Sequence, residues 1–362
     1  MIVANILHRP VRTAVSILAI AIEVVMVLIV VGLTGGMVHE TAKRVEGLGA
    51  DLMLQPPGSS YLFGVSSAPM PIKIGNRLAE LDHVLAVTPV LFQFNATGGI
   101  NVIYGIDMAS FDRVTGGFVY HKGGPFTGPD DLLVDDLYAR ANHVKVGQAI
   151  NLLNHDFRVT GIVEHGKGAR LFIPLSTAQD MAGAHDKTSI FFVKCTDPGY
   201  TDDVVESIRQ LLPTYKVLSV RDYETLMTSN NLPALNTFVA ALIAVAVSIG
   251  FLVIFLSMYT TITERTREIG ILKSLGASKR YIISAILREA GLLCAFGIVA
   301  GWMGSLIGRR VIMASFPTLT VDLTVVWGVR AAVLALAGTL VGAFYPAFRA
   351  AQLDPVDALS YE

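Results

Sequence analysis

The stretch Gly161–Gly168, GIVEHGKG, contains residue types that could bind the phosphates of a nucleotide. It comes within one residue of the loop G-x-x-x-x-G-K-[ST], in which backbone amides and a lysine hold phosphates and a hydroxyl holds magnesium. Gly168 stands where that hydroxyl is required, and the following ARLFIPLS reads as a strand rather than a helix. We therefore predict a hairpin turn between the strands DFRVTGIV and RLFIPL.

The histidines and paired aspartates form no pattern that is typical of catalysis or metal binding. All eight histidines lie in the first 185 residues without an H-E-x-x-H or H-x-x-x-H pair. His155 and His165 flank a predicted strand, which favours solvent-facing loop positions. Aspartate doublets at 130–131, 135–136 and 202–203 are expected at helix starts, where carboxylates interact favourably with the helix dipole. We expect no active site, no metal and no cofactor.

Glu23 is a polar residue inside a long apolar segment. It lies about 16 Å along a helix from Arg12, near the middle of a bilayer, where a charge costs at least ~2.5 kcal/mol. We expect it to face protein, to be protonated, or to pair with Arg288 or Arg330. A buried inter-helix or dimer-interface contact and a site that senses substrate or protons both stay open. Arg288 lies nearer a helix end, where a long side chain can reach the membrane surface.

A charged stretch, TITERTREIGILKSLGASKRYI, spans residues 261–282. Thr261 and Glu264 have capping-box spacing, which predicts a short amphipathic helix at about 261–277. Gly276 suits a left-handed C-terminal cap, and Ser278 can cap the next helix. The charged positions are Glu264, Arg265, Arg267, Glu268 and Lys273, and an apolar stripe is expected from Ile269, Ile271, Leu272 and Leu275. Such a helix either lies in the membrane interface or fits a groove on a partner.

The composition indicates a membrane protein. Of 362 residues, 52% are hydrophobic and 16% are charged, with a mean hydropathy of +0.56, whereas soluble domains carry about 25% charged residues. A net charge of -1 argues against a nucleic-acid partner. Segments of about 20 apolar residues can cross a bilayer. Four qualify: Thr13 to Leu33, Thr237 to Met258, Tyr281 to Ile307, and Leu323 to Phe348, the last interrupted by Arg330.

Positive charge predicts the orientation of these spans, because cytoplasmic loops are enriched in lysine and arginine. Basic residues precede the first span, fill the link between the second and third, and follow the fourth, so both termini are expected in the cytoplasm. Arg309 and Arg310 in the third-to-fourth loop are a mild exception. About 190 residues, from roughly 41 to 232, are then extracytoplasmic, where nucleotide is scarce.

The large insertion is expected to form its own α+β domain. HVLAVTPVLFQF and INVIYGID have the composition of strands, while DDLLVDDLYARANHV and TDDVVESIRQLL show helical spacing. The flanks GGMVHETAKRVEG and SVRDYETLMTSNNLPALN are predicted to be helical stalks. The chain thus divides into residues 1–40 with the first span, the insertion 41–232, and residues 233–362 with three spans and a C-terminal tail.

Three stretches resemble the FtsX/MacB-like permeases of ABC transporters. ERTREIGILKSLGAS is similar to the family signature E-R-x-R-E-I-G-x-x-[RK]-A-x-G-A-[ST], and YPAFRAAQLDPVDALSYE resembles the family ending. RVTGIVEHGKG with LFIPLSTAQDMAG is similar to the extracytoplasmic domain of these proteins. Ser274 stands where the family often has alanine, and Ser360 where it often has arginine.

The resemblance implies a non-catalytic permease subunit with four spans in the bacterial inner membrane. It implies a cytoplasmic ABC ATPase on a separate chain, which would seat on the helix carrying Glu264, Arg267, Glu268 and Gly270, and a second permease copy or homologous permease. ATP-driven closure would move the extracytoplasmic domain, a mechanism called mechanotransmission. Membrane lipid and a periplasmic adaptor are further expected partners. Export or extraction of a lipoprotein, lipid, peptide or drug-like molecule is the leading hypothesis. Activation of a partner such as a cell-wall hydrolase is the alternative.

Overall fold

The computed structural model describes residues 10–59, 69–95, 101–226 and 233–354. Its contacts divide the chain into two compact units. The first, here called the helical unit, consists of residues 1–36, 233–314 and 319–362; the second, the sheet unit, consists of residues 37–232 and 315–318.

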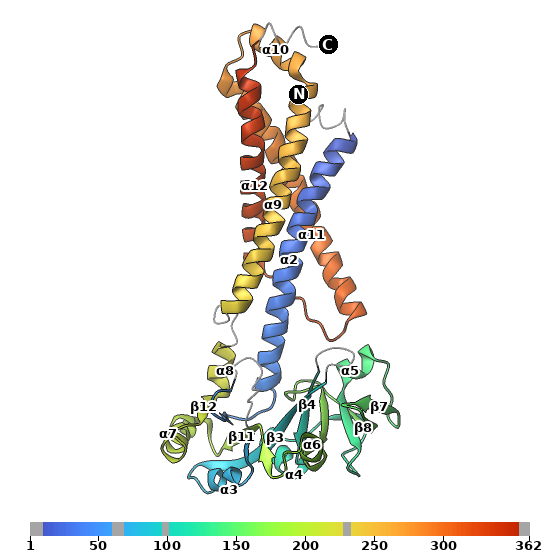
Figure 1. Cartoon of the computed structure of the whole chain (residues 1–362), viewed down its shortest axis with the longest axis vertical. Coiled ribbons are helices and arrows are strands. Elements are labelled where there is room, and N and C mark those ends of the chain that lie inside the picture. Colours follow the sequence, from blue (N-terminus) through green and yellow to red (C-terminus); the bar gives the residue numbers. More distant parts are fainter. Residues whose placement is uncertain (1–9, 60–68, 96–100, 227–232, 355–362) are drawn as a thin grey trace. The chain divides into compact units, whose positions relative to one another are not determined.

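Within these described ranges, four long helices are apolar enough to cross a membrane, which confirms the four predicted spans (Figure 1). They are α2 (Pro10–Glu46), α9 (Pro233–Glu264), α11 (Lys279–Ser315) and α12 (Val325–Gln352). Their lengths of 28 to 37 residues exceed the roughly 20 that a bilayer requires.

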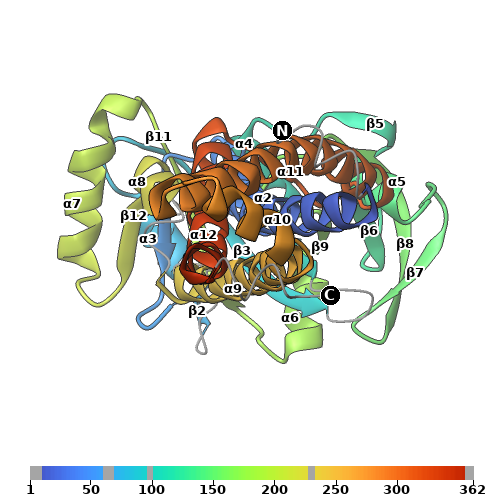
Figure 2. The ribbon, with the colours of Figure 1, turned by 90° about the horizontal axis from the view of Figure 1, so that it is seen from above.

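Small residues allow these helices to pack closely. A Cβ added at Gly297 of α11 would overlap Ile20 of α2, and one at Gly301 would overlap Val24. Because the hydrophobic effect does not drive helices together in lipid, close van der Waals contact at small residues is what holds them. Seen from above, α11 and α2 lie next to each other and α10 lies across one end of the helices (Figure 2).

The contacts inside the helical unit show that the chain passes back and forth between two ends. Ser16 near the start of α2 hydrogen-bonds Ser257 near the end of α9, with 2.6 Å between the hydroxyl oxygens. Asp322, in the link from α11 to α12, donates its backbone N–H to the carbonyl of Gly32 at 2.9 Å. One end therefore holds α10 (Thr266–Ser274), and the other holds the α11–α12 link.

The sheet unit is built on a mixed sheet whose order, among described residues, is β12-β1-β11-β3-β4-β9-β6-β8-β5, with β7 paired to β8. β4 runs parallel to β9 and β6 parallel to β8, and the other pairs are antiparallel. The strands are β1 (Leu52–Gln55), β3 (Val84–Asn95), β4 (Asn101–Ile106), β5 (Tyr120–Gly123), β6 (Asp131–Asp135), β7 (Ala149–Leu152), β8 (His155–Val163), β9 (Leu171–Pro174), β11 (Ile190–Cys195) and β12 (Lys216–Ser219); β2 (Met70–Pro71) and β10 (Lys187–Thr188) pair separately.

Short helices cover this sheet, and the result confirms the predicted α+β class. They are α3 (Ile74–Ala79), α4 (Met108–Thr115), α5 (Asp136–Ala141), α6 (Leu175–Ala182), α7 (Thr201–Leu211) and α8 (Val220–Leu226), with a 3-10 turn at Pro198–Tyr200. The end of α2 belongs to the same core, because Ala42 and Val45, together with Leu48 just after the helix, share a buried cluster with Phe111 and Phe172. α2 continues past residue 33, which confirms the first helical stalk.

Two predictions about this unit are wrong. β8 and β9 do not form a hairpin, because β6 lies between them and pairs with both. The segment from Asp130 was predicted to be a helix, but its apolar run LLV forms the buried strand β6, and only Asp136–Ala141 is helical. Asp135 does start a helix, whereas Asp131 starts a strand. The second stalk is helical over Val220–Leu226, and residues 227–232 lie outside the described residues.

Candidate functional site

The helix α10 in the link between α9 and α11 begins later than the sequence predicted. α9 continues to Glu264, and the hydroxyl of Thr261 donates to the carbonyl of Ser257 at 2.6 Å. Threonine hydroxyls inside a helix make this bond to the residue four positions back, so the predicted capping box at Thr261 is wrong. Arg265 is the N-cap of α10 and makes no side-chain cap bond.

The end of α10 follows the prediction. Gly276 has a φ of 91°, and its N–H donates to the carbonyl of Lys273, while the N–H of Ala277 donates to Leu272, both at 3.0 Å. This pair of bonds is the Schellman motif, for which glycine is favoured. Ser278 then caps α11 by accepting the N–H of Tyr281 at 3.2 Å. Sharp turns therefore bound α10 on both sides.

Two cations of α10 are used to fasten it to the neighbouring helices. Arg265 contacts Glu268 at 2.9 Å and Glu289 of α11 at 3.4 Å. Lys273 donates to the carbonyl of Ala351 at 3.0 Å and to that of Leu353, at the end of α12. Ile269 packs into a small cluster with Ile262, Ile282, Ala350 and Ala351, and Gly270 is also buried.

The opposite face of α10 is exposed and mixed in character. Glu264, Arg267 and Glu268 are exposed, as are Ile271 at 45% and Leu275 at 80%, while Leu272 is half-buried. The expectation of one apolar stripe is wrong, because residues two apart lie about 200° apart around a helix. Ile269 therefore faces the cluster and Ile271 faces outward. Exposed apolar groups beside charges suit a partner surface.

Glu23 lies at the interface of α2 and α9. Its side chain is 7% exposed, its Oε1 has no hydrogen-bond partner in the described chain, and a Cβ on Gly250 of α9 would overlap its carboxyl group. No described ion pair joins it to Arg288 or Arg330, so the predicted pairing is not found. The guanidinium of Arg330 instead stacks on Trp327 at 4.8 Å, and Arg288 is exposed.

The loop GIVEHGKG holds the ends of two helices of the sheet unit. Lys167 donates from Nζ to the carbonyl of Thr115, the last residue of α4, at 2.6 Å. Gly168 donates its N–H to the carbonyl of Arg44 near the end of α2 at 2.9 Å. With a φ of 82°, Gly168 has no space for a side chain, because a Cβ would overlap the ring of Tyr104. Burial lowers the pKa of Lys167.

The two histidines considered in the sequence analysis lie on the surface of the sheet unit. His155 contacts Asp130 and His165 contacts Asp136, each at 2.8 Å and with both histidines exposed. His155 is the first residue of β8 rather than a loop residue. Across the described ranges, no group of three or more histidine, cysteine, aspartate or glutamate side chains is placed to hold a metal ion.

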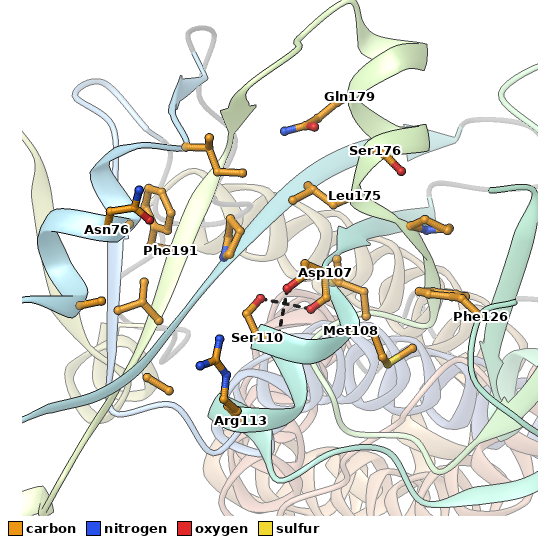
Figure 3. Close-up of a pocket in the computed structure, with 18 of the residues that line it drawn as sticks. Asn76, Asp107, Met108, Ser110, Arg113, Phe126, Leu175, Ser176, Gln179 and Phe191 are labelled. Carbon is orange, nitrogen blue, oxygen red and sulfur yellow. Dashed lines mark hydrogen bonds between the residues drawn. The ribbon is translucent and has the colours of Figure 1, made fainter. Parts of the chain in front are cut away.

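A groove of about 630 Å³ lies on the sheet unit, and sequence reasoning did not find it. In Figure 3, Asn76 of α3, Ser110 of α4 and Gln179 of α6 lie around the strand β3. Leu85, Val87 and Phe191 supply apolar lining, and Arg113 adds a cation. The carboxylate of Asp107 is engaged by the N–H of Ser110 at 3.0 Å. Its lining comes from seven helices and strands without a shared motif, so no local signal marks it.

Four spanning helices with a large sheet unit inserted between the first two define a multi-pass membrane protein of the permease type. The family described as MacB-like periplasmic core domain matches residues 13–211, more than half of the chain, and the FtsX-like permease C-terminal family matches residues 240–355. The chain therefore belongs to the MacB-like, FtsX-containing permease family of ABC transporters, an inner-membrane family.

Named relatives align along almost the whole chain. It is 25% identical over 399 aligned positions to the macrolide export ATP-binding/permease protein MacB of Mannheimia succiniciproducens, covering 100% of this chain and 60% of that protein. It is 27% identical to the pyoverdine export ATP-binding/permease protein PvdT of Pseudomonas fluorescens, covering 97% and 57%. The chain thus spans less than two thirds of the length of these relatives. The solved periplasmic region of MacB from Actinobacillus actinomycetemcomitans is 18% identical, with a TM-score of 0.40, covering 51% of this chain and 96% of that one.

Proposed function

We propose that this chain is the permease part of an ABC exporter and that α10 receives the movement of a cytoplasmic ATPase. The family supports the exporter class, since both relatives named above carry export in their names. The observation that carries the proposal is the division of α10 into two faces. Arg265, Ile269 and Lys273 hold it to α9, α11 and α12, while Arg267 and Ile271 face outward.

A push on the outward face of α10 would reach three spanning helices at once. α10 is bounded by a tight turn on each side and tied to the end of α12 by Lys273. The movement would then pass along the bundle to the sheet unit, as mechanotransmission requires. In this proposal the termini and α10 are cytoplasmic, the sheet unit is extracytoplasmic, and the permease works with a second permease copy. A lipid, lipoprotein, peptide or drug-like molecule is the proposed cargo class, with a periplasmic adaptor as a further partner.

The test is co-purification of the full chain with its ATPase, followed by measurement of ATP hydrolysis in nanodiscs. The double variant Arg267→Glu, Ile271→Asp is expected to lose the ATPase and at least 90% of the stimulated hydrolysis. Val119→Asp is the matched control, because Val119 is an exposed apolar residue of the sheet unit, at 57% against 45% for Ile271. Undiminished ATPase binding by the double variant would reject α10 as the docking helix.

Single cysteines test the orientation independently. Ser274 in α10 and Ser207 in α7 are both exposed. The reagent is a thiol probe that crosses a permeabilised outer membrane but not the inner membrane. In intact cells it is expected to label Ser207→Cys, and it is expected to label Ser274→Cys only after lysis. Labelling of both from the same side would overturn the topology. If ATPase binding and topology hold but no cargo moves, activation of an extracytoplasmic partner becomes the better description.

A further inference from the structure

A buried cluster of charges lies where the end of α2 enters the sheet unit. Arg170, at the start of β9, is 8% exposed. Its Nη1 donates to Asp135 at 3.1 Å, and its Nη2 donates to Glu40 of α2 and to the carbonyl of Thr318 at 3.2 Å. One guanidinium therefore contacts the last part of α2, the helix start of α5, and the link between α11 and α12.

A second arginine completes the cluster. Arg44, one turn after Glu40, approaches it at 3.9 Å and also donates to Thr41 at 3.3 Å. Two arginines and two carboxylates give no net charge, so their mutual attraction can compensate for the loss of water. Burial raises the pKa of Asp135, as expected for a carboxylate whose side chain is only 1% exposed.

Backbone groups next to the cluster also contact the same end of α2. Gly168 donates to the carbonyl of Arg44, and a Cβ on Gly47 would overlap the carbonyl oxygen of Gly166. The loop Gly161–Gly168, which resembles a phosphate-binding loop in sequence, thus packs against the end of α2. Buried hydrogen-bonded networks fix one geometry, whereas a helix end held only by apolar contacts can slide.

We infer that Arg170 is a positioning residue that locks the end of α2, residues 37–46, and residues 315–318 within the sheet unit, so that a movement of this helix end also moves the sheet. The role of Arg170 in transmitting movement rests on the proposed function. The rigidity with which Arg170 holds the end of α2 can be measured on this chain alone. Glu40 is the partner on the α2 side, and Asp135 is the partner on the sheet side.

The experiment measures the rigidity of the joint by electron–electron distance measurements between spin labels. Cysteines carrying the labels replace Met37 of α2 and Ser207 of α7, both exposed and both in the sheet unit, in the whole chain with its own two cysteines changed to serine. The wild type is expected to give a narrow distance distribution in nanodiscs. Arg170→Met is expected to broaden it at least twofold, and Arg170→Lys to broaden it less, because an ammonium cannot reproduce the forked contacts of a guanidinium.

Two further variants keep the test decisive. Glu40→Gln removes the contact of Arg170 with α2 but leaves the Arg170–Asp135 pair intact. It therefore distinguishes loss of the contact with α2 from loss of folding. This variant is expected to broaden the distance distribution as well. Arg158→Met removes an arginine that is 62% exposed and pairs with Asp131, and it is expected to leave the width unchanged. Distributions as narrow as wild type in both Arg170→Met and Glu40→Gln would overturn the inference.

The ATPase complex then separates this inference from the proposed function. A second pair of labels is placed at Ser248 of α9, which is exposed, and at Ser207 of α7. With ATP and vanadate, their separation is expected to change in the wild type. Arg170→Met is expected to reduce that change by more than half while the rate of ATP hydrolysis stays within twofold. Full displacement in Arg170→Met would reject Arg170 as the transmitting joint. A wild-type chain that neither binds nor stimulates an ATPase would reject the proposed function and leave the measured rigidity standing.

Discussion

The α10 link and the Arg170 cluster both use arginine to hold the end of a long helix, but they differ in exposure. At α10, the side chains of Arg265 and Glu289 retain 19% and 17% exposure, and a charged face remains open on the other side. In the cluster, Arg170 retains 10% and Asp135 only 1%. Exposed ion pairs such as Arg265–Glu268, with Glu268 at 64% exposure, contribute little to stability, whereas losing one partner of a buried pair is costly. The Arg170–Asp135 pair is therefore suited to fixing one geometry, and α10 is held less firmly, as our proposal for α10 requires.

The largest predicted effect is on the cluster. Arg170→Met is expected to destabilise the sheet unit by about 3–5 kcal/mol, because it leaves the buried carboxylate of Asp135 without its cation. The cap that Asp135 offers to the N–H of Tyr138 at 2.6 Å is kept, so the loss of the cation alone is tested.

Cys195 provides the measurement. It is buried in the sheet unit, and burial together with the charge of Asp51 raises its pKa to about 11, so it reacts with thiol reagents only when the unit unfolds. Urea titration of thiol labelling, in a Cys294→Ser background, gives the free energy of unfolding. Asp130→Asn, at a residue whose side chain is 60% exposed, should change it by less than about 0.5 kcal/mol. If the buried and the exposed variant changed the free energy of unfolding equally, buried and exposed charges would not differ in their contribution to stability.

The second prediction concerns the side of α10 that faces the bundle. Ile269→Ala is expected to weaken the attachment of α10 by about 2 kcal/mol, at the low end for such a deletion, because the small cluster around it can relax. Amide hydrogen exchange of residues 266–274 should then speed up about 30-fold. Ile271→Ala, on the outward face, is the control and should leave exchange unchanged. Similar acceleration in both variants would mean that α10 has no distinct inner face.

The sequence was sufficient for features set by local composition and insufficient for those set by long-range pairing. Four apolar runs identified the spans because a bilayer imposes their length, and Gly276 and Ser278 marked the ends of helices because those caps are local. The β8–β9 hairpin failed because nothing near Glu164 shows that β6 will insert between the two strands.

The Arg170 cluster was missed for the same reason. Its members lie 130 and 35 residues apart in the chain, and only the fold brings them together. The one local signal was the Glu40–Arg44 spacing on a predicted stalk, which by itself indicates no more than a surface pair. An arginine directly before the apolar run LFI was a second, weaker signal.

The third prediction uses the two aspartates at the ends of β6. Burial acts to raise the pKa of Asp131, but hydrogen bonds from Thr127 and Gly128 and the contact with Arg158 outweigh it, so the net shift is downward. A carboxyl with a lowered folded pKa contributes stability above its unfolded pKa of about 3.9, and that contribution is lost as pH falls through the folded value. Asp131→Asn should cost about 1.5 kcal/mol at pH 7 and nothing at pH 2.

Thiol labelling at a series of pH values cannot follow this loss, because the reagent needs thiolate, so the sheet unit is monitored by hydrogen exchange between pH 2 and 5. The pKa of Asp135, in contrast to that of Asp131, is raised, and burial is the cause. Its ionised form is disfavoured in the folded unit, so its own contribution does not weaken on acidification as that of Asp131 does. A pH dependence that survives Asp131→Asn undiminished would show that another carboxylate is responsible.

The smallest predicted effect is at Glu23, a buried acid for which, unlike Glu40 and Asp135, the described chain provides no arginine. A carboxyl in an apolar setting without a cation is expected to be neutral, so Glu23→Gln preserves both its shape and its charge. Bundle stability and stimulated ATP hydrolysis should stay within twofold of wild type, whereas Gly250→Val, which forces a side chain into the carboxyl group, should impair assembly. If glutamine abolishes coupling while the complex still forms, the acidic proton itself is needed, and Glu23 acts as a proton-binding site rather than as a packing contact between α2 and α9.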